Sequence, residues 1–197
     1  MKLKNLLVSG CVCATMAAFP AMAAISPARG CAVGQVTPAS YTWNFQKETD
    51  AVFQDIQSDA QQVLTRAANL QSVAVVLDYS WYTDSGELTQ LKDLINDMGH
   101  KLCRLETIRR VDTPWQQKTI DHIATTLRLM ADNTTDAILF GNQNQHELWL
   151  PTYQKYVNNL YAQAHSLTQS VEQAVKYAQV QKQEQYLRKD LGIKTSS

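Results

Sequence analysis

The feature that most constrains this chain is a run of apolar residues spaced three and four apart between residues 88 and 105. The run consists of Leu88, Leu91, Ile95, Met98, Leu102 and Leu105. Residues with this spacing lie on one side of a helix, in the a and d positions of a heptad repeat. The pattern therefore predicts a long helix that buries one stripe against other helices.

Three other segments carry similar stripes, so we predict four helices in all. The first is expected over residues 40–77, where no Gly or Pro interrupts the chain between Pro38 and Gly86. Its expected inward residues are Phe45, Val52, Ile56, Val63, Leu70 and Leu77, with Thr49, Ala60, Ala67 and Ala74 at the intermediate steps. The third stripe includes Ile120, Ile123, Leu127, Met130 and Ile138, and the fourth runs from Tyr153 through Val157, Leu160, Ala164, Leu167, Val171 and Ala174 to Ala178.

Three breaks separate these helices. The first connection is expected at 78–83, with Asp84 as the N-cap of the second helix and Glu87 three positions later. The second break is Thr113-Pro114-Trp115-Gln116, a capping box with Pro at the first helical position. The third helix is expected to fray over 141–146, and Pro151 then marks the last break.

Short connections favour antiparallel neighbours. The predicted fold is all-α: an up-down-up-down antiparallel four-helix bundle over residues 40–180, followed by a polar tail at 181–197 that is helical or disordered. This arrangement puts two tryptophans at each end of the bundle, Trp43 with Trp115 and Trp81 with Trp149. We interpret these four side chains as covers for the core edges instead of ligand-stacking groups.

The first 23 residues are typical of a cleaved signal peptide. Lys2 and Lys4 precede an apolar segment at 6–19, and Ala21-Met22-Ala23 forms a small-x-small cleavage site. A retained membrane anchor and a lipoprotein modified at Cys11 are the weaker alternatives. Cleavage leaves an extended lead-in at 24–39, a net charge of about −2 and no membrane span, which predicts a bacterial protein of the periplasm or exterior that binds no nucleic acid.

Two cysteines remain after cleavage, Cys31 in the lead-in and Cys103 on the flank of the second helix. An oxidising compartment allows them to pair. The ten residues from Cys31 to Tyr41 can span about 33 Å when extended, enough to reach Cys103. The open alternatives are a Cys31–Cys103 disulfide and two independent thiols, with Cys103 partly buried.

The sequence holds no strong pattern for a metal, cofactor or catalytic site. Its four histidines form neither a Glu-x-x-His nor a His-x-x-x-His pair, and Cys-x-x-Cys-His is missing. The histidines are His100, His122, His146 and His165. A soft metal at His100 and Cys103 near Met98, or a noncovalent haem held by Met98 or Met130, remains the alternative. No Gly-x-Ser-x-Gly or phosphate-binding glycine loop indicates an enzyme.

Several segments resemble a group of uncharacterised exported all-helical proteins of acidobacteria. They are residues 96–106, 114–117, 130–134 and 149–161. The resemblance implies export and a helical fold, and it implies no activity, cofactor or catalytic residue. We therefore expect a noncatalytic exported bundle with an interaction, scaffold or envelope-associated role, whose partner is another protein or a second copy. The alternative function is a periplasmic metal- or haem-binding bundle.

Overall fold

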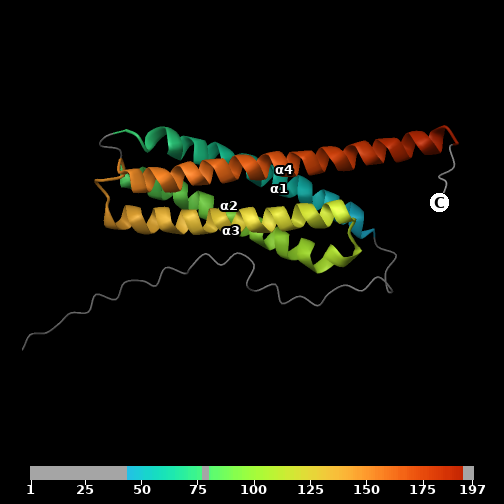
Figure 1. The fold of residues 1–197 in the computed structure, drawn as a ribbon, viewed down its shortest axis with the longest axis horizontal. Helices are drawn as coiled ribbons and strands as arrows, with labels where there is room; N and C mark the ends of the chain where they lie inside the picture. The colour runs from blue at the N-terminus through green and yellow to red at the C-terminus, as the bar shows by residue number, and fades with distance from the viewer. Residues whose placement is uncertain (1–43, 77–79, 193–197) are drawn as a thin grey trace, which may run out of the picture.

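The computed structural model describes residues 44–76 and 80–192, and all regular structure in these ranges is helical (Figure 1). Its elements are α1 (Phe45–Val73), α2 (Trp81–Ile108), a short 3-10 turn η2 (Arg109–Val111), α3 (Pro114–Gln143) and α4 (Pro151–Asp190). The predicted all-α class with four long helices is confirmed. The signal peptide, the lead-in, Trp43 and residues 193–197 lie outside the described residues.

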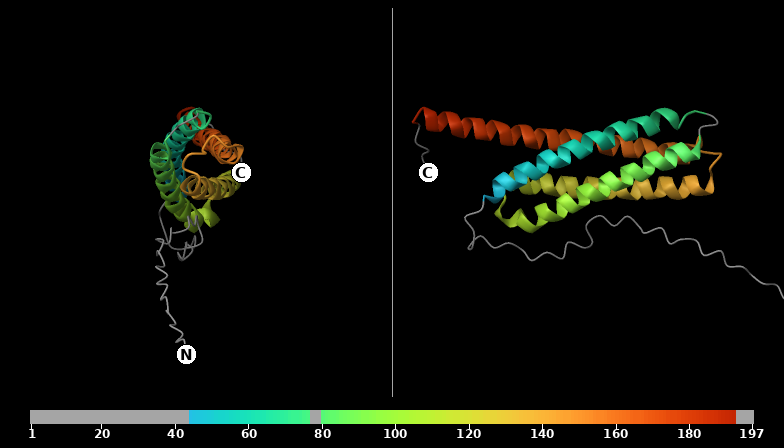
Figure 2. Two further views of the ribbon diagram at one scale, coloured as in Figure 1. Left: turned by 90° about the vertical axis from the view of Figure 1, so that its left-hand side faces the viewer. Right: turned by 180° about the vertical axis from the view of Figure 1, so that it is seen from behind.

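The four helices pack against one another in a ring. α1 contacts α2 and α4, and α3 contacts the same two helices (Figure 2). Contacts between α1 and α2 join the start of one helix to the end of the other: Glu48 pairs with Arg104, and Arg66 pairs with Glu87. The same holds for α1 and α4, where Gln71 donates to Asn158 and Lys182 pairs with Asp50. The helices thus form a bundle.

The core consists of the predicted stripes. All six residues of the stripe between 88 and 105 are at most 1 % exposed. On α1 the predicted inward face is partly wrong, because Phe45 and Val52 are only half-buried, whereas Phe53, which was not predicted to face inward, is fully buried. The buried stripe on α1 consists of Thr49, Phe53, Ile56, Ala60, Val63, Ala67, Leu70 and Ala74, and all of these except Phe53 were predicted. Leu77 lies outside the described residues.

The start of α2 also corrects the sequence prediction. The helix begins at Trp81 with Ser80 as its N-cap, so Asp84 is not a cap. Asp84 lies one turn before Leu88 on the buried stripe and is 1 % exposed. Its Oδ2 accepts a hydrogen bond from the Tyr153 hydroxyl at 2.7 Å, whereas its Oδ1 is buried and has no hydrogen-bond partner among the described residues.

The start of α3 agrees with the prediction. Pro114 is its first residue, and Gln116 Oε1 accepts a hydrogen bond from the Thr113 backbone N–H at 3.0 Å. α3 ends at Gln143, within the segment 141–146 where the sequence predicted that the helix frays or bends. Gly141 itself is still helical, and Trp81 packs directly on it where a β-carbon would overlap the ring.

The longest helix, α4, extends beyond the bundle. Ala178 is its last buried residue, whereas the helix continues to Asp190. This overhang, residues 179–190, is roughly three turns or 18 Å long, and it projects at the end where α1 begins (Figures 1 and 2). Residues 181–190 of the predicted polar tail are therefore helical. No helix in the described ranges is long and apolar enough to cross a membrane.

Candidate functional site

The two ends of the bundle differ in what surrounds their buried groups. The Trp115 end is where α1 and α3 begin, α2 ends and α4 overhangs (Figure 1). The Asp84 end is where α2 and α4 begin and α1 and α3 end. Trp81 and Trp115 both pack against the core, one at each end, whereas Trp149 is 45 % exposed.

A polar network joins α1, α3 and α4 at the Trp115 end. Gln116 of α3 is 1 % exposed, and its Nε2 donates to Asp50 Oδ1 of α1 at 3.1 Å. The other carboxylate oxygen of Asp50 pairs with Lys182 Nζ, on the first turn of the overhang, at 3.1 Å. This ion pair is half-exposed on the lysine side, so its contribution to stability is about 1 kcal/mol or less. Its main effect is to orient the overhang relative to α1.

Beside Asp50, which is itself buried, this end also buries Asp112, in the connection between η2 and α3. It is 7 % exposed, and its Oδ1 accepts a hydrogen bond from Thr49 Oγ1 at 2.7 Å. Its Oδ2 is buried and has no hydrogen-bond partner among the described residues. Burial, opposed by the Thr49 bond and reinforced by the nearby charges of Asp50 and Glu48, raises the pKa of Asp112 to about 6.

Trp115 is the aromatic centre of this end. Its ring lies 6.2 Å from that of Phe53 and 4.9 Å from that of Tyr177, with the latter pair edge to face. The indole Nε1 is buried and has no acceptor within the described part of the chain. Tyr177 itself is 48 % exposed, so the aromatic cluster extends from the core to the surface.

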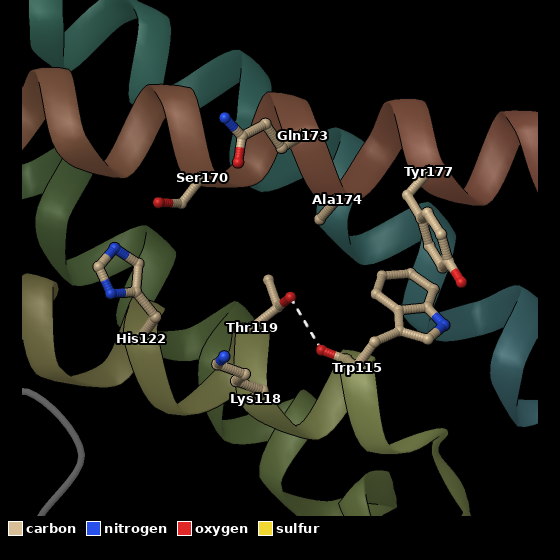
Figure 3. Close-up of a pocket in the computed structure, with 8 residues that line it drawn as sticks. All are labelled: Trp115, Lys118, Thr119, His122, Ser170, Gln173, Ala174 and Tyr177. Carbon is tan, nitrogen blue, oxygen red and sulfur yellow. Dashed lines mark hydrogen bonds between the residues drawn. The ribbon is translucent and has the colours of Figure 1, made fainter.

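A groove of about 400 Å³ between α3 and α4 lies against this cluster (Figure 3). Trp115 and Tyr177 lie side by side at one end of it, and His122 and Ser170 lie at the other. The remaining lining residues are Lys118, Thr119, Gln173 and Ala174. A second groove of about 320 Å³ lies on the other side of Trp115, near Asn44, Asp50 and Lys182. Both grooves are open to solvent surface, unlike the packed interior.

The groove continues onto the overhang as an exposed apolar stripe. Tyr177, Val180, Leu187 and Leu191 are 48 %, 53 %, 48 % and 68 % exposed. With Glu184 between them they are spaced three and four residues apart, so they share one side of α4. We call this set, Tyr177, Val180, Glu184, Leu187 and Leu191, the overhang stripe. Apolar residues in this pattern are typical of a helix that packs against a partner.

At the Asp84 end aromatic side chains pack against one another. The Tyr153 ring is fully buried and stacks on Phe140 with ring centroids 6.1 Å apart. Burial and the Glu87 charge raise the pKa of Asp84, opposed by the Tyr153 hydrogen bond. The burial of Asp84 and Asp112 was not predicted from the sequence. For Asp84 it could have been, because the four-residue step to Leu88 places it on the buried side of the helix.

The residues proposed for a metal or haem are not brought together in the core. Met98 and Met130 are fully buried in the stripes, whereas His100, His122, His146 and His165 are all exposed. Among the described residues no group of three or more His, Cys, Asp or Glu side chains could hold a metal ion. Cys103 is half-buried on α2, and Cys31 lies outside the described residues, so their pairing stays a prediction.

Comparisons with known proteins add no further assignment. No protein-family model, curated protein or solved structure matches this chain.

Proposed function

We propose that this chain is an exported, noncatalytic, antiparallel four-helix bundle that acts by binding another helix along the overhang stripe. The bundle positions α4, and the Trp115 end supplies the contact surface. This proposal extends to the whole sequence: the leader directs the protein to the periplasm or exterior of a bacterium, where the lead-in and bundle form the mature protein.

The overhang stripe is the observation that carries this proposal. Isolated helices shorter than about 12–15 residues are marginal in water. Beyond Ala178 the overhang is joined to α1 by the Lys182–Asp50 ion pair in its first turn, yet Val180, Leu187 and Leu191 expose large apolar groups. Burial of one such side chain stabilises a complex by about 1.5–3 kcal/mol, before the cost of association. A partner helix would therefore stabilise the overhang and cover the stripe.

Site-specific photo-crosslinking in an exporting bacterium tests the proposal. A photoreactive phenylalanine analogue replaces Leu187 on the stripe or, as the matched control, Tyr186 on a different side of the same helix turn. We expect Leu187 to yield a discrete product of higher mass and Tyr186, which is 70 % exposed, to yield none. Equal labelling at both positions, or none at Leu187, would contradict the proposal.

The alternative function, a metal- or haem-binding bundle, is tested on protein purified from its native host. Elemental analysis and a visible absorption spectrum distinguish the two functions. The proposed interaction role predicts no stoichiometric metal and no Soret band. Either signal would replace it with the metal or haem function.

We also propose that Cys31 and Cys103 form a disulfide in the mature protein. The exposed flank of α2 that carries Cys103 lies near the start of α1, since the next residue, Arg104, pairs with Glu48 at 2.6 Å. The lead-in joins the chain at that same end. Thiol titration of the mature, non-reduced protein is expected to find no reactive thiol, whereas two free thiols per chain would contradict the pairing.

The likeness to exported acidobacterial helical proteins is part of the same proposal. It is supported by the residues quoted above and by the helical fold. Amino-terminal sequencing of the secreted product tests the export that this likeness implies, with Ala24 as the expected first residue and Met1 as the contrary result.

A further inference from the structure

The overhang stripe carries a more specific inference, which rests on the proposed function and names the partner. We infer that the overhang of α4 pairs with the overhang of a second copy of this chain, as an antiparallel two-helix contact with twofold symmetry. Three properties of the described residues support a second copy over an unrelated helix: the spacing of the stripe, its charges and its continuity with the groove.

The spacing fits a self-complementary pair. In an antiparallel pair an a position faces a d position of the other helix. Val180 then lies opposite Leu191 of the second copy, and Glu184 lies opposite its Leu187. Because twofold symmetry repeats each contact, the same four residues of each copy form both sides of the interface. They are Val180, Glu184, Leu187 and Leu191. Every large apolar residue of the overhang stripe beyond Tyr177 is covered in this arrangement.

The charges on the stripe are self-complementary as well. Glu184 and Arg188 form an exposed intrahelical pair, with Arg188 Nη2 2.7 Å from Glu184 Oε1. Such an i, i+4 pair contributes only about 0.3–0.5 kcal/mol, so its members can readily exchange partners. In the antiparallel pair each Glu184 lies level with Leu187 of the second copy, beside the flank of that helix that carries Arg188. Two equivalent contacts between opposite charges therefore replace one contact within each helix.

The groove enlarges the interface. Three turns of paired helix bury a small surface compared with the roughly 1,200 Å² that stable interfaces bury. In this register the tip of the second copy's α4 ends level with Val180, one turn from Tyr177, which lines the 400 Å³ groove together with Trp115. Contact there adds an aromatic surface to the helix pair. The small total area predicts a weak, reversible dimer with a Kd on the order of micromolar.

Sedimentation equilibrium of the mature, disulfide-intact protein tests this inference. We expect a reversible monomer–dimer equilibrium. Leu187→Lys is expected to weaken dimerisation at least about tenfold, since it places a charge in the centre of the contact. The matched control Tyr186→Lys should change the Kd less than about twofold. Circular dichroism melts should show that both variants fold, because neither residue contacts the core.

A charge-exchange experiment tests the symmetry. Glu184→Arg alone and Arg188→Glu alone should each abolish dimers, because each places like charges across the contact. An equimolar mixture of the two variants should form a heterodimer with at least the wild-type affinity. Failure of the mixture to associate would overturn the antiparallel arrangement.

The outcome separates this inference from the proposed function. A protein that stays monomeric at all concentrations, yet crosslinks through Leu187 to a different protein, would overturn self-association and leave the interaction role intact. A crosslink from Leu187 to residues 24–43 of the same chain would overturn self-association too, with the lead-in as the occupant. The absence of any crosslink would remove both proposals.

Discussion

Each end of the bundle buries an aspartate that accepts a hydrogen bond from a hydroxyl group of a neighbouring helix. Tyr153 donates to Asp84 and Thr49 donates to Asp112, each at 2.7 Å. At the Asp84 end Tyr153 stacks on Phe140 and Trp81 packs on Gly141, whereas the Trp115 end carries two open grooves, neither of which is lined by Asp112 itself. The same buried group thus belongs to a closed end in one case and to an open end in the other. The two ends therefore differ in whether open grooves are present, and they are alike in holding a buried carboxylate.

The largest effect is expected from the packing of Trp81 on Gly141 at the Asp84 end. Gly141→Ala places a methyl group inside the space of the indole ring, so Trp81 must move, at a cost of about 3 kcal/mol. Gly86→Ala is the matched control, since it lies in α2 at the same end with nothing within 4 Å of the added carbon. That control should gain about 0.5–1 kcal/mol. Urea unfolding measures both, and equal effects would contradict a closed Asp84 end.

Removal of the two hydroxyl donors compares the ends directly. Tyr153→Phe leaves the Asp84 carboxylate without its donor in a site that is 1 % exposed, at an expected cost of about 2 kcal/mol. Thr49→Val does the same to Asp112, and we expect about 1 kcal/mol, because Asp112 is 7 % exposed and therefore less deeply buried than Asp84. Urea unfolding at pH 7 gives both values. A greater loss for Thr49→Val would reverse our assignment of the closed end.

The pH dependence of Asp112 gives the third comparison. Its folded pKa of about 6 exceeds the usual value of 3.8, so the folded state binds the proton more tightly than the unfolded state. Its contribution to stability is therefore full below about pH 4 and is lost as the pH rises through 6. Asp112→Asn cannot ionise, so we expect it to be about 1 kcal/mol more stable than the natural chain at pH 7.5.

Unfolding curves at pH 4.5 and 7.5 test this sign. The natural chain should lose more stability between these values than Asp112→Asn loses. Asp84 contributes in the same direction in both proteins, because burial also raises its pKa, and it therefore cancels in the difference. An equal loss in both proteins would show that Asp112 ionises normally in the folded state.

The smallest effect is expected from removal of the overhang. A chain that ends after Lys182 keeps its ion pair with Asp50 and loses only exposed residues of α4. Its free energy of unfolding, measured at a protein concentration where the natural chain is monomeric, should change by less than about 0.5 kcal/mol. A larger loss would mean that the overhang stabilises the fold itself, which would weaken the case for an interaction element.

Much of the fold follows from local patterns in the sequence. The stripe from Leu88 to Leu105 and the Thr113–Gln116 capping box are both where the spacing predicted them. Two errors have different causes. The burial of Asp84 was missed because it depends on a partner, Tyr153, that is 69 residues away. On α1 the spacing alone did not distinguish Val52, which is half-buried, from its neighbour Phe53, which is fully buried.

The candidate site was less predictable than the fold. The apolar stripe beyond Ala178 thins to Leu187 and Leu191, and these two residues alone do not distinguish a projecting helix from a disordered tail. The overhang is identified by the extension of α4 past the terminal residues of α1, α2 and α3 at the Trp115 end. That extension is a property of the assembled bundle. The grooves at Trp115 likewise depend on α3 and α4 lying side by side.

The central claim, that binding occurs at the open end, is tested most directly by crosslinking from both ends in one experiment. The photoreactive residue replaces either Leu187 on the overhang or Tyr82 on α2, which is 87 % exposed at the Asp84 end. We predict an intermolecular product from Leu187 and none from Tyr82. A product from Tyr82 alone, or equal products from both positions, would contradict the claim.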